Sequence, residues 1–227
     1  MTFKRLLRSV NRGIVLAVVL LIGLSCYLVY DSFAFKKEKE YIISTVLNYA
    51  IESEKMSILP QSEIKAGEKP SDTAVKQKIE ENKEIIAKYM TDSANPWGGS
   101  AQKYTASENE SLFLDNSGSC SYLTDCNFEV NVTKLKKVGP DIAKGKISVK
   151  STIKTIGNPR YIRLFWGAQA NESNNEYRGD MYYKPGIFET EIDTEKHSYT
   201  SEGSFENVLF KKVNGVWKIS DIGWYNW

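Results

Sequence analysis

The sequence predicts an α+β protein with an N-terminal transmembrane helix, followed by amphipathic helices and an antiparallel sheet. Residues 13–30, GIVLAVVLLIGLSCYLVY, carry no charge, and the apolar character continues to Phe35. A bilayer core needs roughly 20 apolar residues in a helix. Two later segments place apolar residues at the three- and four-residue spacing of amphipathic helices. From Phe128 onward, apolar and polar residues alternate as they do in half-buried strands.

The charges beside the apolar run predict its orientation. The preceding residues 1–12 include four basic residues and no acidic one, whereas residues 31–40 hold three lysines and three acids. Because basic residues stay on the cytoplasmic side, we expect a cytoplasmic tail (1–12), a signal-anchor helix (13–35) and an extracytoplasmic domain (36–227). This topology is a single-pass protein of the plasma membrane with its C-terminal domain outside the cell.

Two other interpretations of the N-terminus stay open. A lipoprotein would be acylated at Cys26, but Gly23 stands where such signals carry Leu or Val, and the run stays apolar beyond Cys26. A prepilin leader cut after Gly13 would leave an apolar helix, as in pilins and pseudopilins. Those proteins usually carry Glu five residues after the cut, where this chain has Val18.

Two helices are expected at the start of the domain. Residues 36–59 form the first, which ends before Pro60 and has its apolar stripe at Ile43, Val46, Leu47, Ala50 and Ile51. Residues 73–90 form the second, with Ser71 or Asp72 as the N-cap. Its predicted buried side holds Val75, Ile79, Ile86 and Tyr89. Residues 91–127 show no clear period and are predicted to be an irregular segment.

The remaining chain is predicted to be β-structure. Residues 128–132 alternate, and Gly139-Pro140-Asp141 is expected to turn. Residues 146–156 alternate again, with an inward face of Ile147, Val149, Ser151 and Ile153. Residues 204–212 and 217–224 form a hairpin around Asn214-Gly215, since Asn-Gly suits a type I′ turn. Between residue 156 and this hairpin, the strand candidates are 161–168, 181–183 and 187–192, and residues 171–180 are expected to form a polar loop. The aromatic tail that ends at Trp227 is expected to dock on the domain.

This order of elements, closed by the hairpin SFENVLFKKVNGVWKISDIGW, resembles the NTF2-like superfamily (cystatin-like fold) over residues 38–227. The resemblance implies a strongly curved sheet that forms a cone. A short tail, one membrane helix and an external domain of this kind also look like the VirB8 and TcpC family of conjugation-channel components, which are assembly scaffolds without catalysis.

These resemblances imply a non-enzymatic scaffold or binding module of the bacterial cell envelope, within a conjugation or secretion assembly. The expected partners are other envelope proteins or further copies of the chain. A pseudopilin-like subunit is one alternative. The other is an NTF2-like cone that binds a small ligand or catalyses a reaction, and the sequence does not identify that ligand.

The candidate site residues are few. Cys120 and Cys126 are expected to form a disulfide outside the cell. No His or third Cys lies near them in sequence, so neither a metal site nor a cofactor is expected. The single histidine, His197, lies in a polar stretch that is interpreted as a turn tip, and no nucleophile or phosphate-loop motif is present. No catalytic residue is assigned.

Lys146, Lys150 and Lys154 share one face of the predicted strand 146–156. They could bind an anionic partner, or they could pair with the acids of residues 189–206 on a neighbouring strand, which is the favoured interpretation. Removing the four basic residues of the tail from the total of 30 leaves 26, against 28 acidic residues. Since the remaining chain is slightly acidic, nucleic acid is not an expected partner.

Overall fold

The computed structural model describes residues 12–94, 99–120, 122–157, 169–171, 176–178, 194–222 and 224–226. The chain divides into two compact units, Met1–Tyr41 and Ile42–Trp227. Helix α2 (Arg12–Met56) is 45 residues long and begins in the first unit. It is long and apolar enough near the N-terminus to cross a membrane, and its aliphatic side chains there, such as Leu20 and Leu21, are exposed.

The second unit contains a layer of helices. After α2 and a short 3₁₀ turn, η1 (Gln61–Glu63), comes α3 (Asp72–Tyr89). The hydroxyl of Ser71 accepts a hydrogen bond of 3.2 Å from the backbone N–H of Ala74, which confirms Ser71 as the N-cap. The predicted buried side is also confirmed, since Val75, Ile79, Ile86 and Tyr89 are all buried.

A third helix of this unit, α4 (Ala101–Ser119), was not expected from the sequence. The prediction of an irregular segment at 91–127 is therefore wrong over this range. The sequence AQKYTASENESLFLDNSGS offers few apolar residues and no stripe, so periodicity could not reveal the helix. Tertiary contacts support it instead: Phe113 is buried in one cluster with Ile79 of α3, and Asn109 accepts a hydrogen bond of 2.9 Å from Asn82.

In the described part of the chain, seven strands form one sheet, mostly antiparallel, in the order β1-β2-β5-β4-β3, while β6 and β7 also pair with β5. Their bounds are β1 (Tyr122–Gly139), β2 (Ile142–Ile156), β3 (Gln169–Asn171), β4 (Glu176–Arg178), β5 (Lys196–Val213), β6 (Val216–Asp221) and β7 (Trp224–Asn226). Strands β3 and β4 overlap the predicted polar loop at 171–180. The strand candidates at 161–168, 181–183 and 187–192 lie outside the described residues.

Several sequence predictions for the sheet are confirmed. Ile147, Val149, Ser151 and Ile153 of β2 are buried, and the residues between them are more exposed. Asn214 and Gly215 have φ values of 51° and 82°, as a type I′ turn requires. The tail docks by its backbone, because Trp224, Tyr225 and Asn226 pair with Glu206, Phe205 and Ser204 of β5.

The sheet is curled, and β1 and β5 each carry an extra residue opposite neighbouring positions of β2. In β1, Thr133 to Lys136 spans three steps opposite two in β2 (Lys146 to Lys144), and in β5, Val208 to Phe205 spans three steps opposite two in β2 (Gly145 to Ile147). Gly145 pairs with Val208 of β5, next to Asn207, whose φ is +63°. A Cβ added to Gly145 would lie 3.1 Å from Leu135 Cδ1, so glycine allows the close approach of β1. Bulges at one level bend adjacent strands together.

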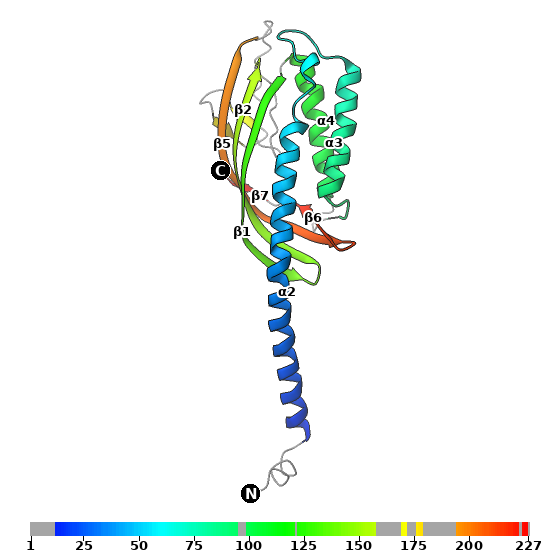
Figure 1. Ribbon diagram of the computed structural model, residues 1–227, viewed down its shortest axis with the longest axis vertical. Helices are drawn as coiled ribbons and strands as arrows, with labels where there is room; N and C mark the ends of the chain where they lie inside the picture. The colour runs from blue at the N-terminus through cyan, green and yellow to red at the C-terminus, as the bar shows by residue number, and fades with distance from the viewer. Residues whose placement is uncertain are drawn as a thin grey trace. The chain divides into compact units, whose positions relative to one another are not determined.

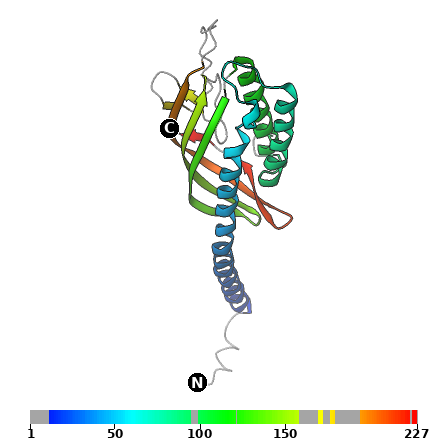
Figure 2. The ribbon, with the colours of Figure 1, turned by 45° about the horizontal axis from the view of Figure 1, so that its top comes forward.

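The core of the second unit lies between the helices and one face of the sheet. Figures 1 and 2 show α3, α4 and the later part of α2 on this face, beside β1, β2 and β5. The largest fully buried side chains come from both layers: Ile42, Val46, Tyr49, Ile86, Met90, Ile147, Ile153, Phe210 and Ile219. The helix layer is also joined to the sheet through backbone, since Thr91 N donates to Ile219 O at 3.0 Å.

Candidate functional site

The predicted lysine row lies on the face of β2 opposite the core. Each of its lysines has an acid within ion-pair distance. The pairs are Lys146–Glu206 at 2.5 Å, Lys150–Glu202 at 3.5 Å and Lys154–Asp125 at 2.8 Å. Two of these acids come from β5, as the charge pattern predicts, and Asp125 comes from β1. The arrangement favours cross-strand pairing over an open cationic surface.

These ion pairs lower the pKa values of two of the acids. A hydrogen bond from Lys146 lowers the pKa of Glu206 below its ordinary value. A hydrogen bond from Lys154 does the same to the pKa of Asp125. Both carboxylates are therefore ionised at neutral pH and hold the lysines within the sheet.

The disulfide prediction is not supported, because Cys120 and Cys126 are both free thiols. Cys120 follows the end of α4 with a φ of +55°, and β1 starts two residues later, at Tyr122. A strand rises roughly 3.3 Å per residue, so β1 carries the chain away from Cys120 before it reaches Cys126. The missed β1 start explains the error. Burial raises the pKa of the Cys126 thiol.

The prediction that His197 lies at a turn tip is wrong, because His197 lies in β5, opposite Thr155 of β2. The polar residues before it hid the strand, which begins at Lys196. Within the described ranges, no group of three or more His, Cys, Asp or Glu side chains is placed to hold a metal ion.

A second polar cluster joins α2 to α3. Glu52 accepts hydrogen bonds of 2.6 Å from both Lys88 Nζ and the Tyr89 hydroxyl. The Tyr89 ring packs against Tyr49 with centroids 5.7 Å apart. Burial, and then the hydrogen bond to Glu52, raise the pKa of Tyr89, while that of Lys88 is raised by its hydrogen bond to Glu52. Since both donors stay protonated at neutral pH, this geometry suits a clamp between helices better than a proton acceptor.

No family model, curated protein or solved structure matches this chain.

The outer face of α2 in the second unit, defined here by Leu47 and Ile51, is the strongest candidate for an interaction surface. Both were predicted to pack on the sheet, but they are 39% and 57% exposed. The buried stripe is rotated and consists of Ile42, Val46, Tyr49, Ala50 and Ser53. Both stripes have helical spacing, so periodicity alone could not choose between them. The side chain of Tyr49 determines which stripe is buried, because it is large and apolar over most of its surface and lies fully enclosed in the domain.

Proposed function

We propose that this chain is a non-enzymatic, membrane-tethered scaffold or binding module of the bacterial cell envelope. The outer face of α2 carries the proposal: Leu47 and Ile51 are aliphatic side chains one helical turn apart that the domain leaves exposed. Ser44 and Asn48 lie beside them and hydrogen-bond to each other at 3.3 Å. An aliphatic pair with a polar border suits contact with another protein.

The anchor supports a place in the plasma membrane. Helix α2 is long and apolar enough to cross a bilayer near the N-terminus. The basic residues before it favour a cytoplasmic N-terminus and an extracellular domain at 36–227. The curled sheet and apolar helix are compatible with an NTF2-like cone on an anchor, the arrangement of the VirB8 and TcpC family. This likeness supports our proposal that the chain works within a conjugation or secretion assembly.

The packing of the domain favours a scaffold over a ligand-binding cone. Among the described residues, the face of the sheet that would line such a cone holds fully buried side chains, including Ile147, Ile153 and Phe210. Tyr49 and Val46 of α2 are also fully buried. A small-molecule site needs a hollow with a few convergent polar groups, which these packed apolar side chains do not offer.

Site-specific crosslinking of the full chain in native membranes tests the scaffold. A photoreactive residue at Leu47 or at Ile51 is expected to give a discrete adduct with another envelope protein or a second copy. The matched control is the same residue at Lys76, which is exposed on α3. Leu47→Ser/Ile51→Ser should remove the complex without unfolding the domain. Equal adducts at Lys76, or none at either α2 position, would contradict the proposal.

A pseudopilin-like subunit is the second candidate, favoured by the continuity of α2. Its 45 residues run from an apolar start to an amphipathic end as one helix, as the resemblance to pilins requires. Cleavage after Gly13 would remove residues 1–13. The intact mass of the chain purified from membranes decides: a loss equal to that leader supports the pseudopilin, and the full mass excludes it.

A further inference from the structure

Two turns meet at one end of the second unit. The backbone N–H of Lys212, in β5, donates to the carbonyl of Asp141, in the β1–β2 turn, at 2.8 Å. Trp217, just after the β5–β6 turn, accepts a hydrogen bond of 3.3 Å at its carbonyl from Thr45 of α2. Figures 1 and 2 show both turns at the end where α2 enters the domain. We call this end the hairpin surface.

Aliphatic residues project from the hairpin surface. Val138 before the β1–β2 turn is 52% exposed, Ile142 after it 39%, and Val216 after the β5–β6 turn 56%. These three aliphatic side chains therefore bury little of their own surface within the domain.

The lysines of the hairpin surface differ from the lysine row. Lys136 lies directly opposite Lys144 in the β1–β2 register, and like charges placed so repel each other. Lys211 of β5 lies opposite Lys218 of β6; Lys218 donates to the carbonyl of Ala87 at 2.7 Å. Within the described part of the chain, no acid lies within ion-pair distance of Lys136, Lys144 or Lys211. An external anion would relieve this repulsion.

The covalent chain limits how far Thr45 can lie from the end of the apolar run. Thr45, which bonds to Trp217, follows Phe35 by ten residues. Ten residues span roughly 15 Å as a helix, and at most about 36 Å when fully extended. This limit holds whatever the orientation of the domain.

We propose that the hairpin surface docks on the anionic headgroups of the bilayer in which the chain is anchored. Lys136, Lys144 and Lys211 would bind lipid phosphates, and the aliphatic turns would enter the headgroup layer. Lysines beside exposed aliphatic side chains are the pattern of interfacial membrane contacts. The proposal rests on the membrane anchor but not on any protein partner.

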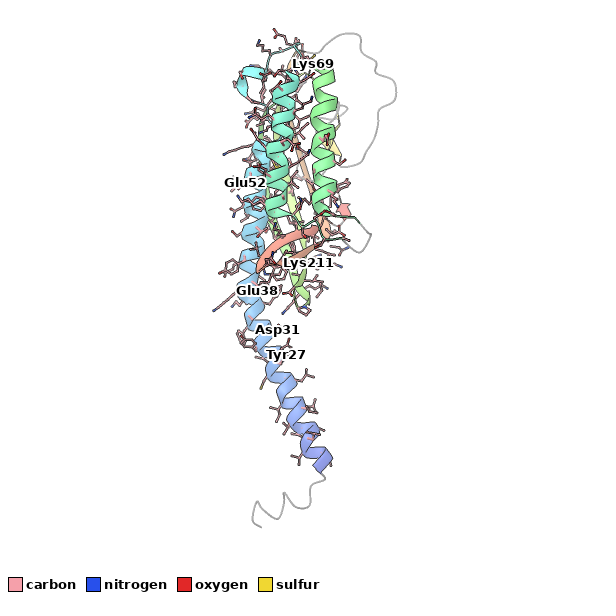
Figure 3. The ribbon with its side chains drawn as sticks, turned by 90° about the vertical axis from the view of Figure 1, so that its right-hand side faces the viewer. Tyr27, Asp31, Glu38, Glu52, Lys69 and Lys211 are labelled. Carbon is pink, nitrogen blue, oxygen red and sulfur yellow. The ribbon has the colours of Figure 1, made fainter. Side chains whose placement is uncertain are left out.

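A fluorescent probe on the full chain tests the contact. In a Cys26→Ser/Cys120→Ser background, Val216→Cys is labelled with an environment-sensitive dye and the protein is reconstituted into vesicles. We expect blue-shifted emission in phosphatidylcholine with phosphatidylglycerol, and less in phosphatidylcholine alone. The same dye at Lys69→Cys should not shift, because Lys69 and Lys211 lie at opposite ends of the domain (Figure 3).

Charge variants make the test specific. The triple variant Lys136→Gln/Lys144→Gln/Lys211→Gln should abolish the shift. Each lost lysine is expected to lower the equilibrium constant for contact with the bilayer by about fivefold. The matched control, Lys65→Gln/Lys69→Gln/Lys76→Gln, changes the same charge elsewhere and should keep it. Near-ultraviolet circular dichroism checks that each variant is folded, and vesicle flotation checks that it is anchored. A folded, anchored chain without the shift, or with a shift that the triple variant retains, overturns the proposal.

Discussion

Glu54 joins α2 to the edge of the sheet through one side-chain oxygen. Its Oε1 accepts a hydrogen bond of 2.9 Å from the backbone N–H of Phe128 in β1. Glu54→Ala should destabilise the domain by about 1–3 kcal/mol, because a partly buried N–H loses its acceptor. Glu54→Gln keeps an oxygen and should lose less. Thermal unfolding of the full chain in detergent gives the comparison, and equal losses for both variants would contradict this role.

Cys126 should be the protected thiol of the domain. It is buried, and burial, followed by the charges of Glu54 and Asp125, raises its pKa. Since the thiolate is the reactive form, maleimide should label Cys126 only after unfolding, even at moderately alkaline pH. Cys120 is less buried and should react first. Peptide mapping without reductant measures both, and a linked Cys120–Cys126 peptide would refute the arrangement.

At the scale of elements, the ion pairs of β2 should make the stability of the domain depend on pH. The folded pKa values of Glu206 and Asp125 lie below their unfolded values. Their contribution is therefore complete above the unfolded pKa, near 4, and is lost as pH falls through the folded pKa. Lys146→Met/Lys154→Met should flatten the fall in melting temperature between about pH 5 and pH 3. Lys144→Met should leave its shape unchanged, and an equally steep curve for the double variant would exclude the pairs.

The helix layer depends on Asn82, which is fully buried in α3. Its amide nitrogen donates to the carbonyl of Met56 at 2.8 Å and to Asn109 of α4 at 2.9 Å. Asn82→Ala should cost about 2–3 kcal/mol, because a buried carbonyl loses a donor. Gln77→Ala, on the exposed side of α3, should be nearly neutral. Urea unfolding of the full chain in detergent compares them; similar midpoints would show that Asn82 does not hold the layer.

For the whole molecule, the apolar run predicts membrane integration. Leu20→Arg/Leu21→Arg places two charges near its centre, each costing roughly 2.5–3.5 kcal/mol in insertion. Resistance of the chain to alkaline extraction should then be lost. Asn48→Arg adds a charge to the same helix beyond the run and should remain membrane-bound. Unchanged extraction of the double variant would refute the anchor.

The sequence predicted those parts of the fold whose signal is local. Alternation in β2, the Asn214-Gly215 turn and the capped α3 each follow from neighbouring residues. Helix α4 could not be predicted in this way, because its polar sequence is held by contacts such as Asn82–Asn109. The exposed pair on α2 was misplaced for a similar reason: two stripes fit the helical period, and only the packing of Tyr49 distinguishes them. Which acid meets Lys154 depended on strand register.

Strand β6 sets the time at which the domain can finish folding. Trp217 bonds to Thr45 across 172 positions of sequence, and Lys218 bonds to Ala87 across 131. Contacts between such distant positions form slowly, because a long loop must close first. A nascent chain therefore cannot join its early helices to the end of the sheet before the ribosome has nearly completed synthesis. Until then its apolar faces stay open, and a chaperone would have its longest opportunity to bind.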